Sequence, residues 1–178
     1  MKRVLIAGIG NILLGDDGVG PYVVRTLGAN YIFDDGVEIV DVGTPALDFI
    51  DLLDGLDLLI VVDAIRDGAE PGTVKVYEKA ELLRHTPGVR MDPHSPALIE
   101  SLLAAEFYGS GPREVALVGV QGARYEAGCS LSEVVQASVE QTVHEVLRVL
   151  DRADVGFVRR FDEADPAIWW SAAGEEVA

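Results

Sequence analysis

The most regular feature of the sequence is a series of short apolar runs separated by longer segments with helical periodicity. Four runs are continuous and rich in β-branched residues, a pattern typical of parallel strands buried on both faces. They span residues 4–9, 37–42, 58–62 and 115–120. A fifth run, residues 73–78, alternates between apolar and polar side chains and predicts a half-exposed edge strand. Because it follows the run at 58–62 too closely for a crossover helix, we expect it to be antiparallel.

The segments between these runs carry helical patterns. Residues 131–151 give the strongest one, with an apolar stripe made of Val135, Val139, Thr142, Val143, Val146, Leu147 and Leu150. Ser130 and Glu133 have the spacing of a capping box at its start. A shorter pattern covers residues 19–27 and predicts a second helix.

Two more helix starts share a signature. Thr44-Pro45 and Ser95-Pro96 each place a hydroxyl N-cap before a proline at the first helical position, where the missing N–H costs nothing. Strands and helices therefore alternate along the chain, which predicts an α/β fold. We expect three α/β/α layers built on a twisted, mostly parallel five-stranded sheet with one antiparallel edge strand.

The pattern also predicts how the chain is divided. Residues 1–150 carry all the periodic segments and are expected to form a single α/β domain. Residues 151–178 are more acidic and less periodic, and we interpret them as a C-terminal extension of unassigned role. Trp169 and Trp170 in this extension form either a docking element or a segment packed on the domain, and packing is favoured because exposed paired tryptophans lower solubility.

Composition excludes several classes of function. The net charge of −16 disfavours nucleic-acid binding, because an acidic surface repels phosphates and there is no cluster of Lys and Arg. No apolar run is long enough for a membrane span or a signal peptide, so we expect a cytoplasmic protein without membrane attachment. The single cysteine, Cys129, cannot form an intramolecular disulfide. There is no heptad repeat or long apolar edge, and we expect a monomer.

Polar residues follow the predicted strands at the points where these end. Since ligands of open α/β sheets bind beyond the carboxyl ends of the strands, these residues are candidates for one shared site. They are Asn11, Asp16 and Asp17 after the first strand, Asp41 at the end of the second, Asp63 at the end of the third, and His94 just before the helix start at Ser95.

Aspartate oxygens and a histidine nitrogen suit a divalent metal such as nickel, zinc, manganese or cobalt. Three protein ligands would leave a coordination position open for a substrate. The carboxylates could instead act as helix caps or solvated acids. Side chains of adjacent residues diverge, so we favour Asp17 as the ligand and assign Asp16 to a turn or cap, while Asn11 is expected to fix the turn through hydrogen bonds to the backbone.

The glycines after the first strand invite a second interpretation. Gly8 and Gly10 begin a dinucleotide-binding fingerprint, but Leu13 stands where the third glycine belongs. Asp16 and Asp17 would also repel a pyrophosphate. We expect the glycines to serve the backbone conformation, and a nucleotide-binding regulator remains the less favoured alternative.

The same turn resembles a known family. The run GIGNILLGDDGVG, residues 8–20, is similar to the opening motif of the [NiFe] hydrogenase maturation proteases, endopeptidases that remove a C-terminal extension from the large-subunit precursor. The resemblance continues in order at Asp41-Val42-Gly43-Thr44, Val62-Asp63-Ala64, Pro93-His94, Val118-Gly119-Val120-Gln121, Glu126, Gly128, Leu131-Ser132 and Val135. It covers the predicted domain.

The resemblance implies a metal site and a reaction. In that family, residues matching Asp17, Asp63 and His94 contact a metal ion, understood to be the nickel already held by the precursor; another divalent metal is the expected occupant in its absence. Asp41 matches a further acidic position implicated in activity. Asp17 and Asp41 are thus the candidate catalytic residues, with Asp41 activating water or positioning the peptide. The alternative is a non-catalytic checkpoint protein that binds the nickel-loaded precursor without cleaving it.

Two regions depart from the family pattern. Gly122-Ala123 stands where the family often has a proline, which predicts a less constrained loop through Glu126. Residues beyond about 155, including both tryptophans, have no clear counterpart in the family. No role is carried over to them.

Overall fold

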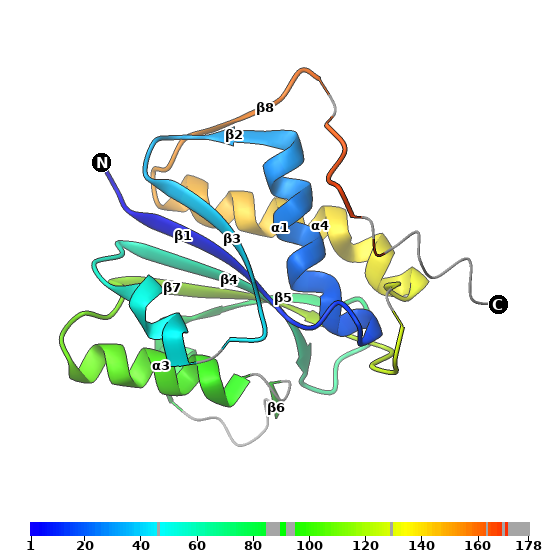
Figure 1. Ribbon diagram of the computed structural model, residues 1–178, viewed down its shortest axis with the longest axis horizontal. Helices are drawn as coiled ribbons and strands as arrows, with labels where there is room; N and C mark the ends of the chain where they lie inside the picture. Colours follow the sequence, from blue (N-terminus) through cyan, green and yellow to red (C-terminus); the bar gives the residue numbers. More distant parts are fainter. Residues whose placement is uncertain are drawn as a thin grey trace.

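Four parallel strands form the centre of the computed structural model (Figure 1), which describes residues 1–45, 47–84, 90–91, 95–128, 130–162, 164–168 and 170. The strands of the main sheet are ordered β3-β1-β4-β7-β5. Their bounds are Val4–Ile9 for β1, Val37–Gly43 for β3, Leu58–Arg66 for β4, Val74–Glu78 for β5 and Glu114–Gln121 for β7. Along this order β5 is antiparallel to β7 and the other pairs are parallel, so the predicted mostly parallel sheet with an antiparallel edge strand is confirmed.

Sequence adjacency does not decide the partner of the edge strand. β5 pairs with β7, which lies between β4 and β5 although it comes later in the chain. Three short strands were not predicted. β6 (Arg90–Met91) pairs with the end of β4, while β2 (Tyr31–Phe33) and β8 (Phe157–Arg159) form a separate antiparallel ribbon.

Two apolar cores lie on the two faces of the sheet because successive side chains of a strand point in opposite directions. Val4 and Ile6 of β1 belong to the core shared with α1 and α4, whereas Leu5 and Ala7 belong to the core shared with α3 and the 3-10 helix η2. These helices span Val19–Asn30 for α1, Ser95–Phe107 for α3, Glu133–Arg152 for α4 and Leu47–Leu53 for η2; the short helices η1 (Gly15–Gly18) and α2 (Lys79–Leu83) complete the order. Three layers result, as predicted.

Two helix starts differ from the prediction. α4 is capped by Ser132, whose hydroxyl accepts a hydrogen bond from the Val135 N–H at 3.5 Å, so the capping box expected from Ser130 and Glu133 is wrong. The helix starts later because the N–H and hydroxyl of Ser132 are bonded to Asp16. The start at Thr44-Pro45 leads into a 3-10 helix, as the connection to β4 is short. Within the described ranges, no helix combines the length and apolar character needed to cross a bilayer.

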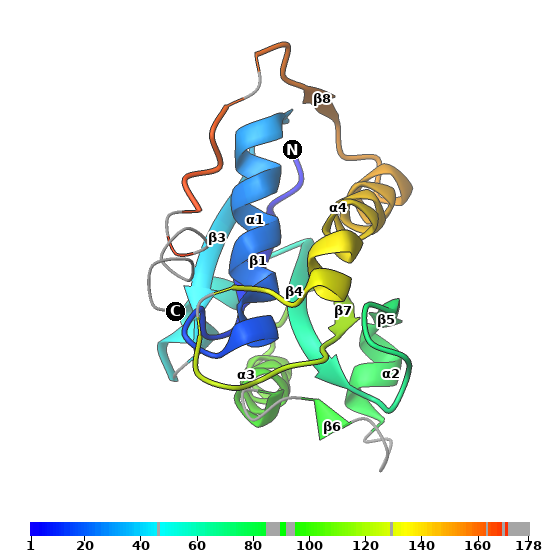
Figure 2. The same cartoon turned by 90° about the vertical axis from the view of Figure 1, so that its right-hand side faces the viewer.

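The chain beyond α4 returns along the domain surface. We call the described residues 155–162, 164–168 and 170 the C-terminal arm. Val155 is buried in the core with α1 and α4, β8 pairs with β2, and the arm then runs beside α1 (Figure 2). Ile168 is 9% exposed and Trp170 only 2% exposed, which is the packing that the sequence favoured for the tryptophan pair. Trp169 lies outside the described residues.

Candidate functional site

The candidate site lies where the winding of the sheet reverses. α1 crosses one face on the way from β1 to β3, whereas α3 crosses the other face on the way from β4 to β7. β1 and β4 are neighbours, so their carboxyl ends flank a topological switch point, where open α/β sheets bind ligands. The pairing of these two strands ends at Gly8 and Val62.

Two buried carboxylates follow this last pair. Asp63 is the next residue of β4 and is 1% exposed; it faces the α3 side of the sheet, as do Val61 and Ile65. Asp17 lies in η1, is 2% exposed and accepts a hydrogen bond from the Asn11 N–H at 2.8 Å. Because η1 packs against β4, two of the acidic residues predicted from strand ends lie on neighbouring elements at this edge of the sheet.

Glycines allow this close approach of helix and strands. A Cβ at Gly20, in the first turn of α1, would lie 2.2 Å from the Ile9 carbonyl oxygen and 2.4 Å from that of Val62. Gly10 has φ +135°, and a Cβ there would lie 1.8 Å from the Asp17 carbonyl oxygen. The glycines therefore serve the backbone, as predicted.

The backbone donors of this turn are used inside the protein. The N–H groups of seven residues donate to protein oxygens: Gly10, Asn11, Leu13, Leu14, Gly15, Asp16 and Asp17. The acceptor for Leu13 is the Asn11 side chain at 3.0 Å, which is the turn-fixing role expected of Asn11. A phosphate-binding loop presents such donors to its ligand, so this geometry disfavours the nucleotide-binding alternative.

Asp16 connects three segments of the chain. It is fully buried, and its carboxylate accepts hydrogen bonds from the N–H groups of Ala123 (2.8 Å), Arg124 (2.8 Å) and Ser132 (2.6 Å) and from the Ser132 hydroxyl (2.9 Å). The loop after β7 and the start of α4 are thereby fixed to η1. This supports the turn or cap role predicted for Asp16, and it restrains the loop at Gly122-Ala123 that the missing proline was expected to loosen.

Asp41 is more exposed than Asp17 and Asp63. It pairs with Gly8 at the end of β3, and its side chain is 29% exposed. Its carboxylate accepts a hydrogen bond from the Gly43 N–H at 3.2 Å and lies 3.6 Å from the Arg25 Nε. A cavity of about 360 Å³ adjoins it, lined by Val40, Asp41, Val42, Thr44, Pro45, Phe49 and Leu52. Bound peptide and water can therefore reach this carboxylate.

His94, the third predicted ligand, lies outside the described residues. The described elements on both sides of it come to the same end of the sheet. Met91 of β6 pairs with Ile65, two residues after Asp63, and α3 begins at Ser95.

Another polar cluster lies beyond β4 and was not predicted. Asp67 is bonded to Lys75, to the Tyr77 hydroxyl at 2.9 Å and to the Ala69 N–H at 2.9 Å. Burial alone would raise the pKa of Asp67, but these partners together lower it below its usual value. Burial and the bond to Asp67 raise the pKa of Tyr77, which stays neutral.

Arg25 also escaped the sequence reasoning. It is the one charged residue of α1, VGPYVVRTLGAN. A single charge on a helix that is buried on much of its surface requires a partner, and this signal could have drawn attention to it.

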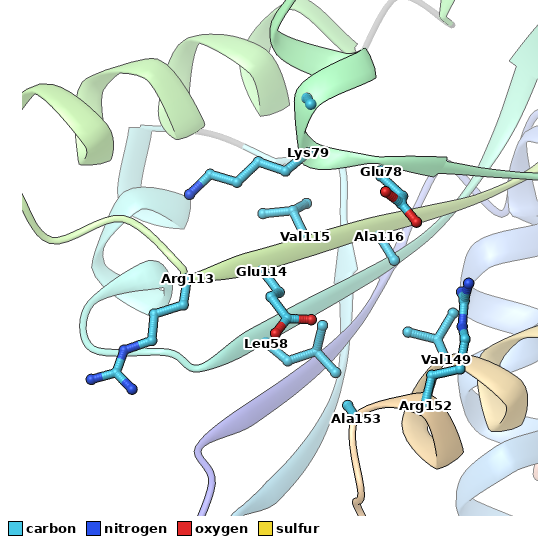
Figure 3. Close-up of a pocket in the computed structure, with 11 residues that line it drawn as sticks. Leu58, Glu78, Lys79, Arg113, Glu114, Val115, Ala116, Val149, Arg152 and Ala153 are labelled. Carbon is cyan, nitrogen blue, oxygen red and sulfur yellow. The ribbon is translucent and has the colours of Figure 1, made fainter.

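A second hollow lies at the opposite end of the sheet (Figure 3). It has a volume of about 430 Å³ and is bordered by Leu58 and Glu114 at the amino ends of β4 and β7 and by Arg152 at the end of α4. None of the predicted site residues that the structure describes lines it; Asp41 and Asp63 instead lie toward the carboxyl ends of β3 and β4.

The chain is similar to a set of named proteins. The family model for hydrogenase maturation proteases matches residues 21–149. The hydrogenase expression/formation protein HupM of Azotobacter chroococcum mcd 1 is 39% identical over 164 residues, which is 92% of this chain and 78% of the relative. The hydrogenase 2 maturation protease of Escherichia coli (strain K12) is 33% identical over 162 residues, 89% of this chain and 96% of the relative.

Solved structures agree with these matches. The hydrogenase maturating endopeptidase HybD from E. coli superposes with a TM-score of 0.83 at 32% identity, covering 89% of this chain and 98% of its own. The [NiFe] hydrogenase maturation protease HybD from Thermococcus kodakarensis gives a TM-score of 0.68 at 26% identity, covering 83% and 98%. These matches in sequence and in structure show that the chain belongs to the hydrogenase maturation protease family.

Proposed function

We propose that this protein is an endopeptidase that removes a C-terminal peptide from the large-subunit precursor of a [NiFe] hydrogenase. Membership of the family supports the peptidase activity, and the E. coli relative of known structure is named a hydrogenase maturating endopeptidase. Within this chain, one observation carries the proposal: the carboxylates Asp17 and Asp63 are both buried on elements that pack together, η1 and β4, at the switch point between β1 and β4.

In this proposal Asp17, Asp63 and His94 bind the nickel ion that the precursor carries. Two carboxylates and an imidazole suit such a divalent ion, and a bound cation compensates the cost of burying two carboxylates. His94 is the third residue after Met91, which pairs with Ile65 of β4, two residues after Asp63. The nickel belongs to the substrate, and its role is recognition.

Asp41 is assigned to the reaction itself. Acting as a general base, its carboxylate takes a proton from the attacking water, the water oxygen adds to the scissile carbonyl carbon, the C–N bond breaks, and the proton passes to the departing amine. The other role for Asp41 is to hold the peptide in place. The variant D41N separates the two roles, because loss of the base lowers kcat whereas loss of a peptide contact raises KM.

The experiment that tests the function is intact-mass analysis of the large-subunit precursor after incubation with this protein, with and without nickel loading. We expect loss of a C-terminal peptide from the nickel-loaded precursor alone. The H94A variant should retain its fold, measured by circular dichroism, and leave the precursor uncut.

The result also separates the protease from the alternatives. An unchanged precursor mass in both states, together with formation of a stable complex, would identify a non-catalytic checkpoint protein. Cleavage that proceeds equally well without nickel would retain the protease and refute the recognition role of the metal. Normal processing by H94A would refute the three-residue ligand set.

A further inference from the structure

A line of contacts connects the C-terminal arm to the candidate catalytic carboxylate. The Arg25 guanidinium lies over the Trp170 ring, 5.1 Å from its centroid. The Nε of the same arginine lies 3.6 Å from Asp41 Oδ2. Arg25 therefore lies between the Trp170 indole and the Asp41 carboxylate and contacts both.

The chemistry of Arg25 suits this intermediate place. A guanidinium is planar, so it can stack on an aromatic face and keep its edge directed at a carboxylate. Its side chain is 39% exposed and that of Asp41 is 29% exposed, and ion pairs at such exposure contribute little to stability. The pair formed by Arg25 and Asp41 therefore contributes little to the stability of the fold.

The position of Trp170 is set by the rest of the arm. The Gly156 N–H donates to Asp34 Oδ2 at 2.8 Å, and the Arg160 N–H donates to the Asn30 carbonyl oxygen at 2.8 Å. Between these two bonds β8 pairs with β2, at the far end of α1 from the site (Figure 2). The arm is therefore anchored before it reaches Trp170, whose side chain is almost completely buried.

We propose that Arg25 and Trp170 are positioning residues that hold the Asp41 carboxylate in its reactive orientation. This inference rests on the role of Asp41 in the proposed function. Trp170 fixes the plane of the guanidinium, and the guanidinium fixes the carboxylate. It assigns a role to a part of the chain that the family resemblance leaves without one. The competing explanation is an arm that only stabilises α1.

Fluorescence tests the coupling of the three groups without any substrate. The chain has two tryptophans, so the W169F variant leaves Trp170 as the single indole. If Asp41 restrains Arg25 over the ring, adding D41N to W169F releases the guanidinium and raises the quenching of Trp170 by acrylamide. Unchanged emission and quenching in the double variant would refute the coupling. The matched control is D57N in the same background, because Asp57 pairs with a different arginine, Arg113.

Processing kinetics test the consequence for the reaction. We expect R25M to lower kcat about tenfold while KM changes less than twofold, because peptide binding is kept and the orientation of Asp41 is lost. R25K keeps the charge without the stacking plane and should fall between R25M and the wild type. W170L should resemble R25M, whereas W170F, which keeps an aromatic face, should retain most of the rate.

Two control variants distinguish positioning from stability. R113M removes an arginine ion pair at the opposite end of the sheet, and F161L removes an exposed aromatic side chain from the same arm. Both should keep the wild-type kcat. Values of kcat for R25M and W170L that differ from the wild type only in proportion to the folded fraction, measured by thermal unfolding, would overturn the proposal. If the wild-type chain cleaves no precursor, the proposed function fails together with the positioning role, and the fluorescence result still decides whether the three side chains are coupled.

Discussion

The two ends of the sheet treat charged side chains in opposite ways. At the amino ends, Arg113 pairs with Asp57 at 3.1 Å, and the arginine is 81% exposed. At the carboxyl ends, Asp16, Asp17 and Asp63 are all 2% exposed or less. Exposed ion pairs contribute between about 0 and 1 kcal/mol, whereas burying a charge costs several kcal/mol unless its surroundings compensate. The three carboxylates buried at the carboxyl ends therefore indicate a structural or chemical use there.

The comparison also separates two adjacent residues. Asp16 has a compensation that is fully described, since four donors from the loop after β7 and from α4 bond to its carboxylate. Asp17 lies in η1, which packs against β4, the strand that carries Asp63. The proposed function places the substrate's metal at these two carboxylates. Burial alone therefore does not distinguish a structural carboxylate from a functional one.

The largest expected effect on precursor processing comes from removing the negative charge of Asp63. D63N keeps the size of the side chain and should lower the rate of precursor processing by about a thousandfold or more, because a neutral amide is a poor metal ligand. Single-turnover cleavage followed by intact mass measures it. A rate within threefold of the wild type would contradict the assignment of Asp63, and circular dichroism provides the control for folding.

The second effect is on stability. D16A leaves the donors of Ala123, Arg124 and Ser132 without their buried acceptor and should lower the free energy of unfolding by about 3 kcal/mol. Urea denaturation measures this change. The matched control E140A, at an exposed position of α4, should change it by less than about 0.5 kcal/mol. Equal effects of the two variants would show that Asp16 does not fasten the loop.

A smaller effect is expected from pH at the cluster beyond β4. The folded-state pKa of Asp67 is lowered, so its ionised form contributes stability above the unfolded pKa of about 4, and this contribution is lost as the pH falls through the folded value. Urea midpoints measured from pH 6 downward should decrease less steeply for D67N than for the wild type. Parallel pH profiles of the two proteins would disprove this contribution.

The smallest effect belongs to the amino end. R113M removes an exposed ion pair and should lower the free energy of unfolding by no more than about 1 kcal/mol, with less change at high salt. Thermal unfolding at low and high salt measures it. A loss as large as that of D16A would remove the contrast between the two ends of the sheet.

Much of the fold could be predicted because its information is local. The four parallel strands are continuous apolar runs, and the rule that ligands bind beyond strand ends placed Asp17 and Asp63 at one edge. The ribbon of β2 and β8 was missed, since each strand has three residues and Val158 in its centre is 61% exposed. The contact of Arg25 with Trp170 could not be predicted either, because it depends on the path of the arm across α1.

The pairing of β2 with β8 has a consequence for synthesis on the ribosome. Asp34 and Gly156, which form a hydrogen bond beside this ribbon, are 122 residues apart. At about 5–20 residues per second, several seconds of translation separate them. The strands of the main sheet are all made before the arm emerges, so a nascent chain can assemble its buried carboxylates first. Trp170 reaches Arg25 only afterwards. The contacts that connect the C-terminal arm to Asp41 are therefore the last part of the site to form.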